Sequence, residues 1–446
     1  MSDAPLSAAH ANGGFAALVD DRPHDGVFRI DRRIYNDPAV LEAEYERIFE
    51  RTWLFLCHDT QIPNPGDFIS TYMGRQPVIV VRGNDGAIHC FLNACGHRGA
   101  LLVARKTGNA TTFDCPYHGF CFDTQGTCVS ARNRTTGWPE GFDIKRFNLR
   151  PIAKVASYRG FVFGSLSPDV SDLETFLGGT ARLIDIFVEP APAELEIVPG
   201  YCTYISQCNW KLMHENGPDA FHAPVVHRNF AETIANRETR DGLSGVAKTE
   251  RGRLTARIDS ASYEVGNGHT VFWHERIDRS VYPIYEKQEE LAKRFSPEQM
   301  DWITGKGRHI TVFPNLLLND LASSHLRTYR PLGVDRMETT IWCIAPKGEP
   351  AEMRAARLRK FEDFFLPSGM ATPDDIALCE EAHISSHGKH AGWFELSRGD
   401  AFRKDGPDDA AKAIGFEPVA STTSWDHELT LQGVYRQWRK FMSGEA

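Results

Sequence analysis

The sequence predicts an α+β protein of two domains: an antiparallel β domain, then a larger domain in which strands and helices mix. At 446 residues the chain is long enough for two domains of ordinary size, each with its own core. Between Phe55 and Phe163, short runs rich in β-branched and aromatic residues alternate with turn signals such as Gly83 to Gly86. Beyond Pro168, strand-like runs are interleaved irregularly with helical patterns, which favours an antiparallel rather than a parallel sheet.

The elements are expected in the following order. Residues 1–50 should form an arm and a helix that pack with the second domain, residues 51–167 the β domain, and residues 168–446 the second domain. The helix is predicted over Asp37 to Trp53, because Pro38 stands near its start and apolar residues follow at helical spacing. In the second domain we expect strands at Tyr201–Gln207, His309–Leu318 and Glu338–Ala345, and helices at Ala351–Phe365 and Leu429–Met442.

Composition excludes several classes of protein. The net charge is −9 without a basic block, so neither nucleic acid nor an anionic membrane is expected as a partner. No apolar stretch approaches the length of a membrane span, and Met1 to Phe15 lacks the pattern of a secretory signal. The ten cysteines suggest no disulfide framework, so we expect a reducing compartment, the cytoplasm.

Two short runs in the β domain carry one Cys and one His each: Cys95 with His97, and Cys115 with His118. Seventeen residues separate the two runs. This order can hold a [2Fe–2S] cluster in which two histidines replace thiolates on one iron, a change that raises the reduction potential. Tetrahedral zinc is the alternative, but zinc fingers usually pair Cys with Cys and His with His. The mixed pairs therefore favour iron–sulfur redox chemistry.

The residues around these pairs suit two tight loops. Gly99 and Gly119 follow the two histidines, and Pro116 follows the second Cys. Glycine permits close approach of the backbone to a bulky cluster. Together the two runs resemble the Rieske motif.

A second group of possible ligands lies between Asn209 and His227. His222 and His227 are five residues apart, which on a regular helix turns the second about 140° away from the first. Both reach one metal only if the helix is interrupted, and Pro224 gives a reason for interruption. Asp219 would share a helix face with His222 and could accept its second ring N–H, the alternative being an ordinary exposed Asp.

A carboxylate could complete this site from downstream, where Asp374 and Asp375 stand at the expected start of a helix. Two histidines and one carboxylate with open positions form the facial arrangement of non-haem iron(II) oxygenases. Helix capping is the alternative for either Asp, and on this segment alone it is favoured over ligation.

With both segments considered, the chain resembles the large (alpha) subunit of Rieske non-haem iron aromatic-ring-hydroxylating dioxygenases from about Arg32 to about Met442. It is most similar to the benzoate/toluate dioxygenase branch. The resemblance implies a Rieske β domain followed by a helix-grip (START-like) catalytic domain. The motifs that carry the similarity to this branch are Gly74–Pro77, Asn93–Cys95, Gly164–Val170, Gly369–Asp375 and Gly406–Ala411.

The resemblance also implies roles for individual residues. Cys95, His97, Cys115 and His118 become the cluster ligands, and His222, His227 and Asp375 become the mononuclear iron ligands. Asp219 becomes a bridge from His222 to His118 of the next subunit, and Asn216 lies near the iron without being a firm ligand. The chain departs from the family at Gly96, Phe120 and Phe221, where polar or basic, Trp and Tyr residues are more usual.

The function implied is that of a terminal oxygenase in the catabolism of aromatic compounds, which adds both atoms of O2 to a benzoate-like acid to give a cis-dihydrodiol. The family also implies a small beta subunit in an α₃β₃ assembly and an NADH-dependent flavin and iron–sulfur reductase on another chain. One alternative is a Rieske monooxygenase or hydroxylase of a substituted acid such as salicylate or anthranilate. A non-enzymatic Rieske electron carrier is the other, although it would need only the first domain.

The substrate pocket is predicted from the chemistry of carboxylate binding, which favours a bidentate guanidinium in a dry pocket. Arg308 enters the strand that should line the pocket, so we prefer it to Arg327 and Arg330, which flank the next strand. For any one of the three, a solvated or structural arginine is the favoured alternative. The candidate walls, which could equally be ordinary core, are Trp273, Phe313 and Leu316.

Overall fold

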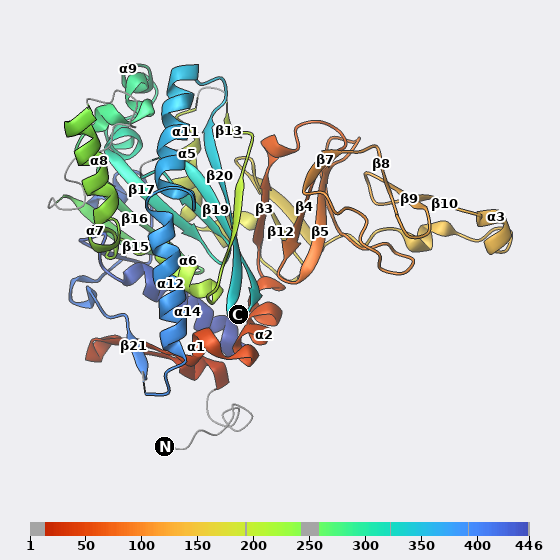
Figure 1. The fold of residues 1–446 in the computed structure, drawn as a ribbon, viewed down its shortest axis with the longest axis horizontal. Coiled ribbons are helices and arrows are strands. Elements are labelled where there is room, and N and C mark those ends of the chain that lie inside the picture. The colour runs from red at the N-terminus through yellow and green to blue at the C-terminus, as the bar shows by residue number, and fades with distance from the viewer. Residues whose placement is uncertain (1–13, 192–193, 242–257, 322, 391, 445–446) are drawn as a thin grey trace. The chain divides into compact units, whose positions relative to one another are not determined.

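The computed structural model describes residues 14–191, 194–241, 258–321, 323–390 and 392–444. The chain divides into two compact units (Figure 1). One unit combines Met1–Glu44 with Leu177–Ala446, and the other is Tyr45–Phe176. Residues 14–44 therefore belong with the second half of the chain.

The unit Tyr45–Phe176 consists mainly of antiparallel strands in three small sheets, ordered β6-β5-β4-β7, β11-β12-β3 and β10-β9-β8. Buried Phe68, Ile79 and Phe113 belong to a core that also contains Cys95 and Cys115. The loops that carry these cysteines are thus supported directly by apolar packing. The strands are β3 (Leu54–His58), β4 (Asp67–Met73), β5 (Gln76–Arg82), β6 (Ile88–Leu92), β7 (Thr107–Asn109), β8 (Thr112–Asp114), β9 (Phe120–Asp123), β10 (Cys128–Ala131), β11 (Lys154–Tyr158) and β12 (Phe161–Ser165).

The other unit is built on one large antiparallel sheet with the order β13-β20-β19-β18-β17-β16-β15-β23-β22, in which β14 also pairs with β20. A separate small sheet has the order β1-β2-β21. The strands are β1 (Val19–Arg22), β2 (Val27–Asp31), β13 (Leu195–Ile197), β14 (Cys202–Ser206), β15 (Ser260–Gly266), β16 (His269–Glu275), β17 (Lys306–Val312), β18 (Leu316–Asn319), β19 (His325–Gly333), β20 (Arg336–Pro346), β21 (Trp393–Glu395), β22 (Lys404–Asp405) and β23 (Ala420–Thr422).

Helices pack against this large sheet and against one another. Helix α14 contacts β15 and β16, α6 contacts β19, and α12 packs on α6. Helix α11, drawn in blue in Figure 1, contacts β20. Besides short 3₁₀ and π turns, the helices are α1 (Arg33–Asn36), α2 (Pro38–Glu44), α3 (Arg134–Gly137), α4 (Leu173–Leu177), α5 (Thr180–Val188), α6 (Trp210–Asn216), α7 (Ala223–Val226), α8 (Arg228–Asp241), α9 (Gln288–Leu291), α10 (Pro297–Met300), α11 (Ala351–Phe365), α12 (Thr372–Ser386), α13 (Asp409–Lys412) and α14 (Leu429–Ser443). Among the described residues, no helix is both long and apolar enough to span a bilayer.

Two of the predicted elements differ from the structure. The strand predicted over His309–Leu318 is two strands, β17 and β18, which pair as a hairpin. Pro314 lies in the turn between them, and proline has no N–H to continue a ladder. The first predicted helix ends at Phe49 rather than Trp53. It consists of α2 and a π turn over Tyr45–Phe49 that follows it directly.

A buried carboxylate joins the start of the chain to its second half. Glu44, the last residue of α2, is 0% exposed and accepts hydrogen bonds from the Nε1 atoms of Trp210 and Trp438, both at 2.7 Å. Its other partner is the ammonium of Lys211, at 2.6 Å. Burial lowers the pKa of Lys211, and the charge of Glu44 opposes this effect. A charge this deeply buried is tolerated only because every partner is in place.

Replacing Glu44 by Ala is expected to destabilise the protein by about 3–5 kcal/mol, because the ammonium of Lys211 would stay buried without its carboxylate. The measurement is urea unfolding of the full chain followed by tryptophan fluorescence. Glu42→Ala, an exposed position on the same helix, is the control and should change stability by less than about 0.5 kcal/mol. Equal midpoints for the two variants would contradict the role given to Glu44.

Candidate metal centres

His222, His227 and Asp375 come together in the structure. One ligand atom from each lies within 4.8 Å of the others. Asp375 Oδ1 is 3.5 Å from His222 Nε2 and 3.4 Å from His227 Nε2. This oxygen is buried and has no hydrogen-bond partner among the described residues. A buried carboxylate oxygen without a donor fits a bound cation, and the two-nitrogen, one-oxygen set with open positions fits iron(II).

The local sequence explains how both histidines reach one point. His222 is the N-cap of α7, and His227 is its C-cap. Helix α7 is only one turn long and has Pro224 in that turn, so the histidines stand at two bends of the backbone instead of on one continuous helix. The interruption predicted at Pro224 is present.

Helix α12 supplies the carboxylate. Its N-cap is Ala371, which leaves both Asp374 and Asp375 inside the first turn. Of the two, only Asp375 is buried. Because α12 packs on α6, the last residue of α6 also reaches the site: Asn216 Nδ2 lies 3.4 Å from His222 Nε2.

Asp219 orients the first histidine. Its Oδ2 lies 3.2 Å from His222 Nδ1, and its Oδ1 accepts the backbone N–H of Phe221 at 2.7 Å. This contact on one ring nitrogen turns the other towards Asp375. Burial lowers the pKa of His222, but Asp219 and then Asp375 outweigh it, so the net shift is upward. Burial raises the pKa of Asp375 to about 6, against the opposing charges of His222 and Arg327.

A cavity lies beside the three ligands, and its described lining combines aromatic and small apolar side chains with two amides and one cation. Arg327 is 5% exposed, and its Nε has no hydrogen-bond partner among the described residues. Burial keeps the pKa of His309 well below its usual range. Besides the ligands, the lining includes Asn216, Asp219, Phe272, His309, Asn319, Arg327, Phe364, Phe365 and Trp425.

The pocket residues predicted from sequence are not among those that line this cavity. Trp273 and Arg308 form one cross-strand pair between β16 and β17, and the neighbouring pair is Phe272 with His309. Successive residues of a strand point to opposite faces, so Trp273 and Arg308 lie on the face of the sheet opposite to this cavity.

The four predicted pocket residues instead make contacts elsewhere in the core. Arg308 pairs with Asp320. Trp273 donates its indole N–H to Tyr263 Oη at 2.9 Å. The remaining two predicted wall residues are core: Phe313 packs against Trp210 and His214, and Leu316 is fully buried.

The loops that carry Cys95 and Cys115, in the other unit, are built alike. In each, the glycine four residues after the Cys donates its N–H to the Cys carbonyl: Gly99 to Cys95 at 2.9 Å and Gly119 to Cys115 at 3.1 Å. Both glycines have φ of 68°, a conformation that favours glycine. The backbone conformation of each loop therefore explains the glycine that follows each Cys and His pair in the sequence.

The histidines of the two loops face each other, with ring centroids of His97 and His118 4.9 Å apart. Both cysteines are buried, and His97 Nδ1 is buried without a hydrogen-bond partner among the described residues. Two buried thiols and a ring nitrogen left without a donor or acceptor fit a [2Fe–2S] cluster. Phe120 stacks on His97 at 4.7 Å between centroids.

Steric crowding explains why position 96 is a glycine. A Cβ at this position would lie 2.2 Å from the carbonyl oxygen of Phe147, which is far too close. The loop packs here against backbone that a side chain would displace, which explains the glycine at this position.

Comparison with known proteins agrees with this geometry. Residues 52–155 match the family described as Rieske [2Fe-2S] domain, and residues 195–444 match the ring hydroxylating alpha subunit (catalytic domain). The chain belongs to the ring-hydroxylating alpha-subunit family. The alpha subunit is 38% identical to the toluate 1,2-dioxygenase alpha subunit of Pseudomonas putida, covering 96% of this chain and 93% of the relative.

Two further comparisons extend over nearly the whole alpha subunit. It is 37% identical to the 2-halobenzoate 1,2-dioxygenase large subunit of Burkholderia cepacia, covering 95% and 91% of the two chains. Its structure is similar to that of naphthalene 1,2-dioxygenase from Rhodococcus sp., with a TM-score of 0.81, 27% identity and coverage of 94% and 95%.

The family resemblance and the two-part α+β fold predicted from sequence are therefore confirmed. The alpha subunit is an oxygenase subunit with a Rieske [2Fe–2S] domain and a mononuclear iron domain. A Rieske electron carrier, the non-enzymatic alternative, is excluded by the match to the catalytic domain.

Asp375→Ala is expected to reduce the content of mononuclear iron to about a tenth or less while the [2Fe–2S] content stays normal, because the two centres use separate ligands. Iron and inorganic sulfide analysis of anaerobically purified protein measures both. Asp374→Ala, one residue away on α12 and less buried, is the matched control and should retain both groups. Loss of iron from the Asp374 variant alone would reverse the assignment.

Proposed function

We propose that this subunit catalyses the addition of both atoms of O2 to a benzoate-like aromatic carboxylate, giving a cis-dihydrodiol. The observation that carries the substrate class is a buried arginine in a cavity that also has aromatic walls, beside His222, His227 and Asp375. The names of the two similar relatives, a toluate and a 2-halobenzoate dioxygenase, refer to aromatic carboxylates and support this class.

Arg327 is the proposed carboxylate anchor. Its guanidinium is 5.5 Å from the centre of the Phe365 ring, and its Nε is free of hydrogen bonds to the described residues. Guanidinium matches the two oxygens of a carboxylate in a bidentate contact, and such charge-assisted bonds are strong in a dry site. Arg308, by contrast, already has Asp320 as its counter-ion. The substrate ring would then rest against Phe272 and Phe364.

The two metal groups supply the redox chemistry: the cluster held by Cys95, His97, Cys115 and His118 would deliver electrons, and iron held by His222, His227 and Asp375 would activate O2. The protein side chains position these groups. Asp219 fixes the ring of His222 through Nδ1, so that Nε2 faces the open side of the site. Asn216 stands beside the same nitrogen and limits where substrate can approach.

Electron transfer between subunits is also part of the proposal, with Asp219 as the bridge from His222 to the cluster ligand His118 of an adjacent copy of the chain. The Asp219 side chain is 29% exposed, so a neighbouring chain can reach it. Around it, Phe221 and Val225 are 50% and 70% exposed, large apolar side chains of the kind that interfaces cover.

The remaining partners are proposed from the family resemblance: a small beta subunit in an α₃β₃ oxygenase, and an NADH-dependent flavin and iron–sulfur reductase. Cytoplasmic location is proposed as well. All ten cysteines are free in the structure, which suits a reducing compartment.

The experiment is turnover of the assembled oxygenase with a reductase, using benzoate, substituted benzoates and neutral toluene. Benzoates should give diol in proportion to O2 consumed. Arg327→Gln is expected to raise the KM for benzoate about 10- to 100-fold, the loss of about 1.5–3 kcal/mol for hydrogen bonds to a charged group, and to leave toluene binding unchanged.

The matched control is Arg330→Gln, on the same strand β19, where the guanidinium pairs with Glu338 outside the cavity. It should leave the KM for benzoate unchanged. An unaltered KM in the Arg327 variant would contradict the proposed anchor. A product containing one oxygen atom from O2 would instead favour a hydroxylase of a substituted aromatic acid.

A further inference from the structure

His309 has a ring nitrogen that no other side chain uses, in the cavity beside the metal ligands. The residue belongs to β17, is 5% exposed and lines that cavity. Its Nε2 is buried and has no hydrogen-bond partner among the described residues. Among those residues, the side chains whose ligand atoms meet within 4.8 Å are His222, His227 and Asp375, without His309. Neither a protein partner nor a place in the ligand set therefore accounts for Nε2.

Asn319, the cross-strand partner of His309 on β18, decides which ring nitrogen carries the proton. The backbone N–H of Leu321 donates to Asn319 Oδ1 at 2.8 Å, which fixes the orientation of the amide. The amide Nδ2 lies 3.0 Å from His309 Nδ1, and an amide nitrogen can only donate. Nδ1 is therefore the acceptor, and the ring carries its proton on Nε2. Burial, and then the charge of Arg327, lower the pKa of His309, which disfavours a second proton.

The ring of His309 is held in place, and space is left in front of Nε2. Phe272 stacks on the ring, with centroids 5.0 Å apart and planes 23° from parallel. Gly217 lines the same cavity, and a Cβ at position 217 would lie 3.4 Å from Nε2. A side chain there would cover the nitrogen, whereas glycine leaves it open. The Nε2–H group is therefore a donor available to a molecule bound in the cavity.

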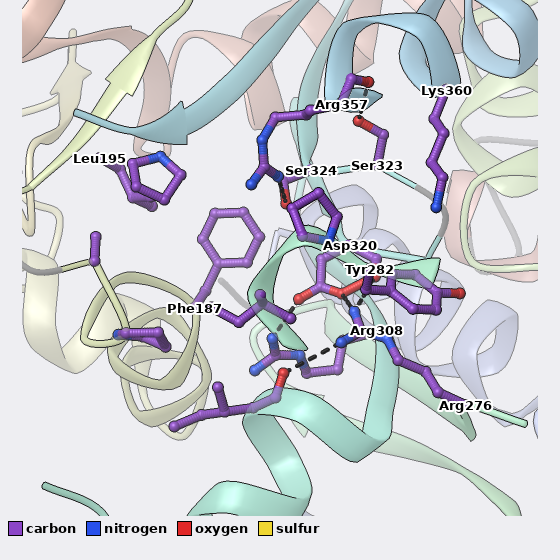
Figure 2. Close-up of a pocket in the computed structure, with 16 residues that line it drawn as sticks. Phe187, Leu195, Arg276, Tyr282, Arg308, Asp320, Ser323, Ser324, Arg357 and Lys360 are labelled. Atoms are coloured by element: carbon purple, nitrogen blue, oxygen red, sulfur yellow. Dashed lines mark hydrogen bonds and ion pairs between the residues drawn. The ribbon is translucent and has the colours of Figure 1, made fainter. Parts of the chain in front are cut away.

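On the opposite face of the sheet, the chain supplies an acceptor of its own. Arg308 lines a separate cavity there, in which Asp320 lies between Arg276 and Arg308 (Figure 2). Asp320 Oδ1 accepts from Arg276 Nη2 at 2.5 Å, and Oδ2 accepts from Arg308 Nη2. On the face of His309, by contrast, both His309 Nε2 and Arg327 Nε are buried without an acceptor among the described residues. These two donors await an acceptor that a ligand brings.

We propose that His309 Nε2 donates a hydrogen bond to the substrate carboxylate and is a second specificity-determining donor beside Arg327. This inference rests on the benzoate-like substrate proposed above. A buried N–H without an acceptor is costly, and a carboxylate oxygen is a strong acceptor in a dry site.

Two donors do more than recognise charge. His309 is on β17 and Arg327 is on β19, so a carboxylate held by both is fixed at two points. The direction of the substrate ring beside His222, His227 and Asp375 is then fixed as well. A neutral arene would leave both N–H groups without an acceptor, so the cavity would discriminate against it.

The test is calorimetric titration of the anaerobic oxygenase, with both metal groups present, using benzoate and toluene. His309→Leu removes the donor, whereas the amide of His309→Gln can place an N–H near the position of Nε2. Benzoate should bind about tenfold or more weakly to the Leu variant, as expected for loss of a hydrogen bond to a charged group, and less than about threefold more weakly to the Gln variant. Toluene has no acceptor and should not bind more weakly to either variant. Iron and inorganic sulfide analysis checks that both variants keep their metal groups.

Benzoate affinity of the Leu variant equal to that of wild type would overturn the inference. Equal losses for benzoate and toluene, or equal losses in the Leu and Gln variants, would show a merely structural role and overturn it too. Arg327→Gln in the same titration separates the two proposals. If only Arg327→Gln weakens benzoate binding, the anchor stands and the His309 inference fails; if only His309→Leu does, the reverse holds. A wild-type protein that binds toluene but not benzoate would contradict both.

A second measurement does not depend on variants. In crystals of the wild-type oxygenase with benzoate bound, one carboxylate oxygen should lie about 2.7–3.2 Å from His309 Nε2. A carboxylate with both oxygens beyond about 3.5 Å from this nitrogen, with or without a water between them, would contradict the proposal.

Discussion

The contact between Asp219 and His222 is the interaction on which the catalytic half of the molecule depends. It fixes one ring nitrogen of His222 so that the other faces Asp375. One ligand atom each of His222, His227 and Asp375 then lies within 4.8 Å of the others. Two segments that are far apart in sequence must meet for this to happen: the stretch from the end of α6 to α7, and the start of α12. Glu44 holds α6 in place through Trp210 and Lys211. A bound cation would offset the cost of burying His222, His227 and Asp375 together.

Strand β17 separates two chemically different spaces. On one face, His309 lines the cavity beside the metal ligands, where Arg327 forms no ion pair with a carboxylate of the described residues. On the other face, Arg308 shares Asp320 with Arg276. The arginines on the two faces of β17 are therefore balanced in different ways.

Sequence predicted the chemistry of this protein better than its pocket. The loop of Cys95 and the break at Pro224 depend on short-range rules of spacing and backbone geometry, which the residues themselves reveal. The pocket depends on which face of β17 each side chain takes. Every residue of β17 is buried, so polar and apolar residues do not alternate along it. The sequence therefore does not reveal to which face of the sheet each side chain points. Nor could the sequence show that Asp320 neutralises Arg308, because that pairing exists only once β17 and β18 have folded together.

The most direct test of the account measures electron transfer in Asp219→Asn. The variant keeps a side chain of the same size but removes the charge that orients His222. With both metal groups present at normal content and substrate bound, reoxidation of the reduced cluster by O2, followed in stopped flow, should slow by about 100-fold or more, and diol yield should fall with it. Reoxidation and product yield close to wild type, at native metal content, would contradict the bridging role of Asp219.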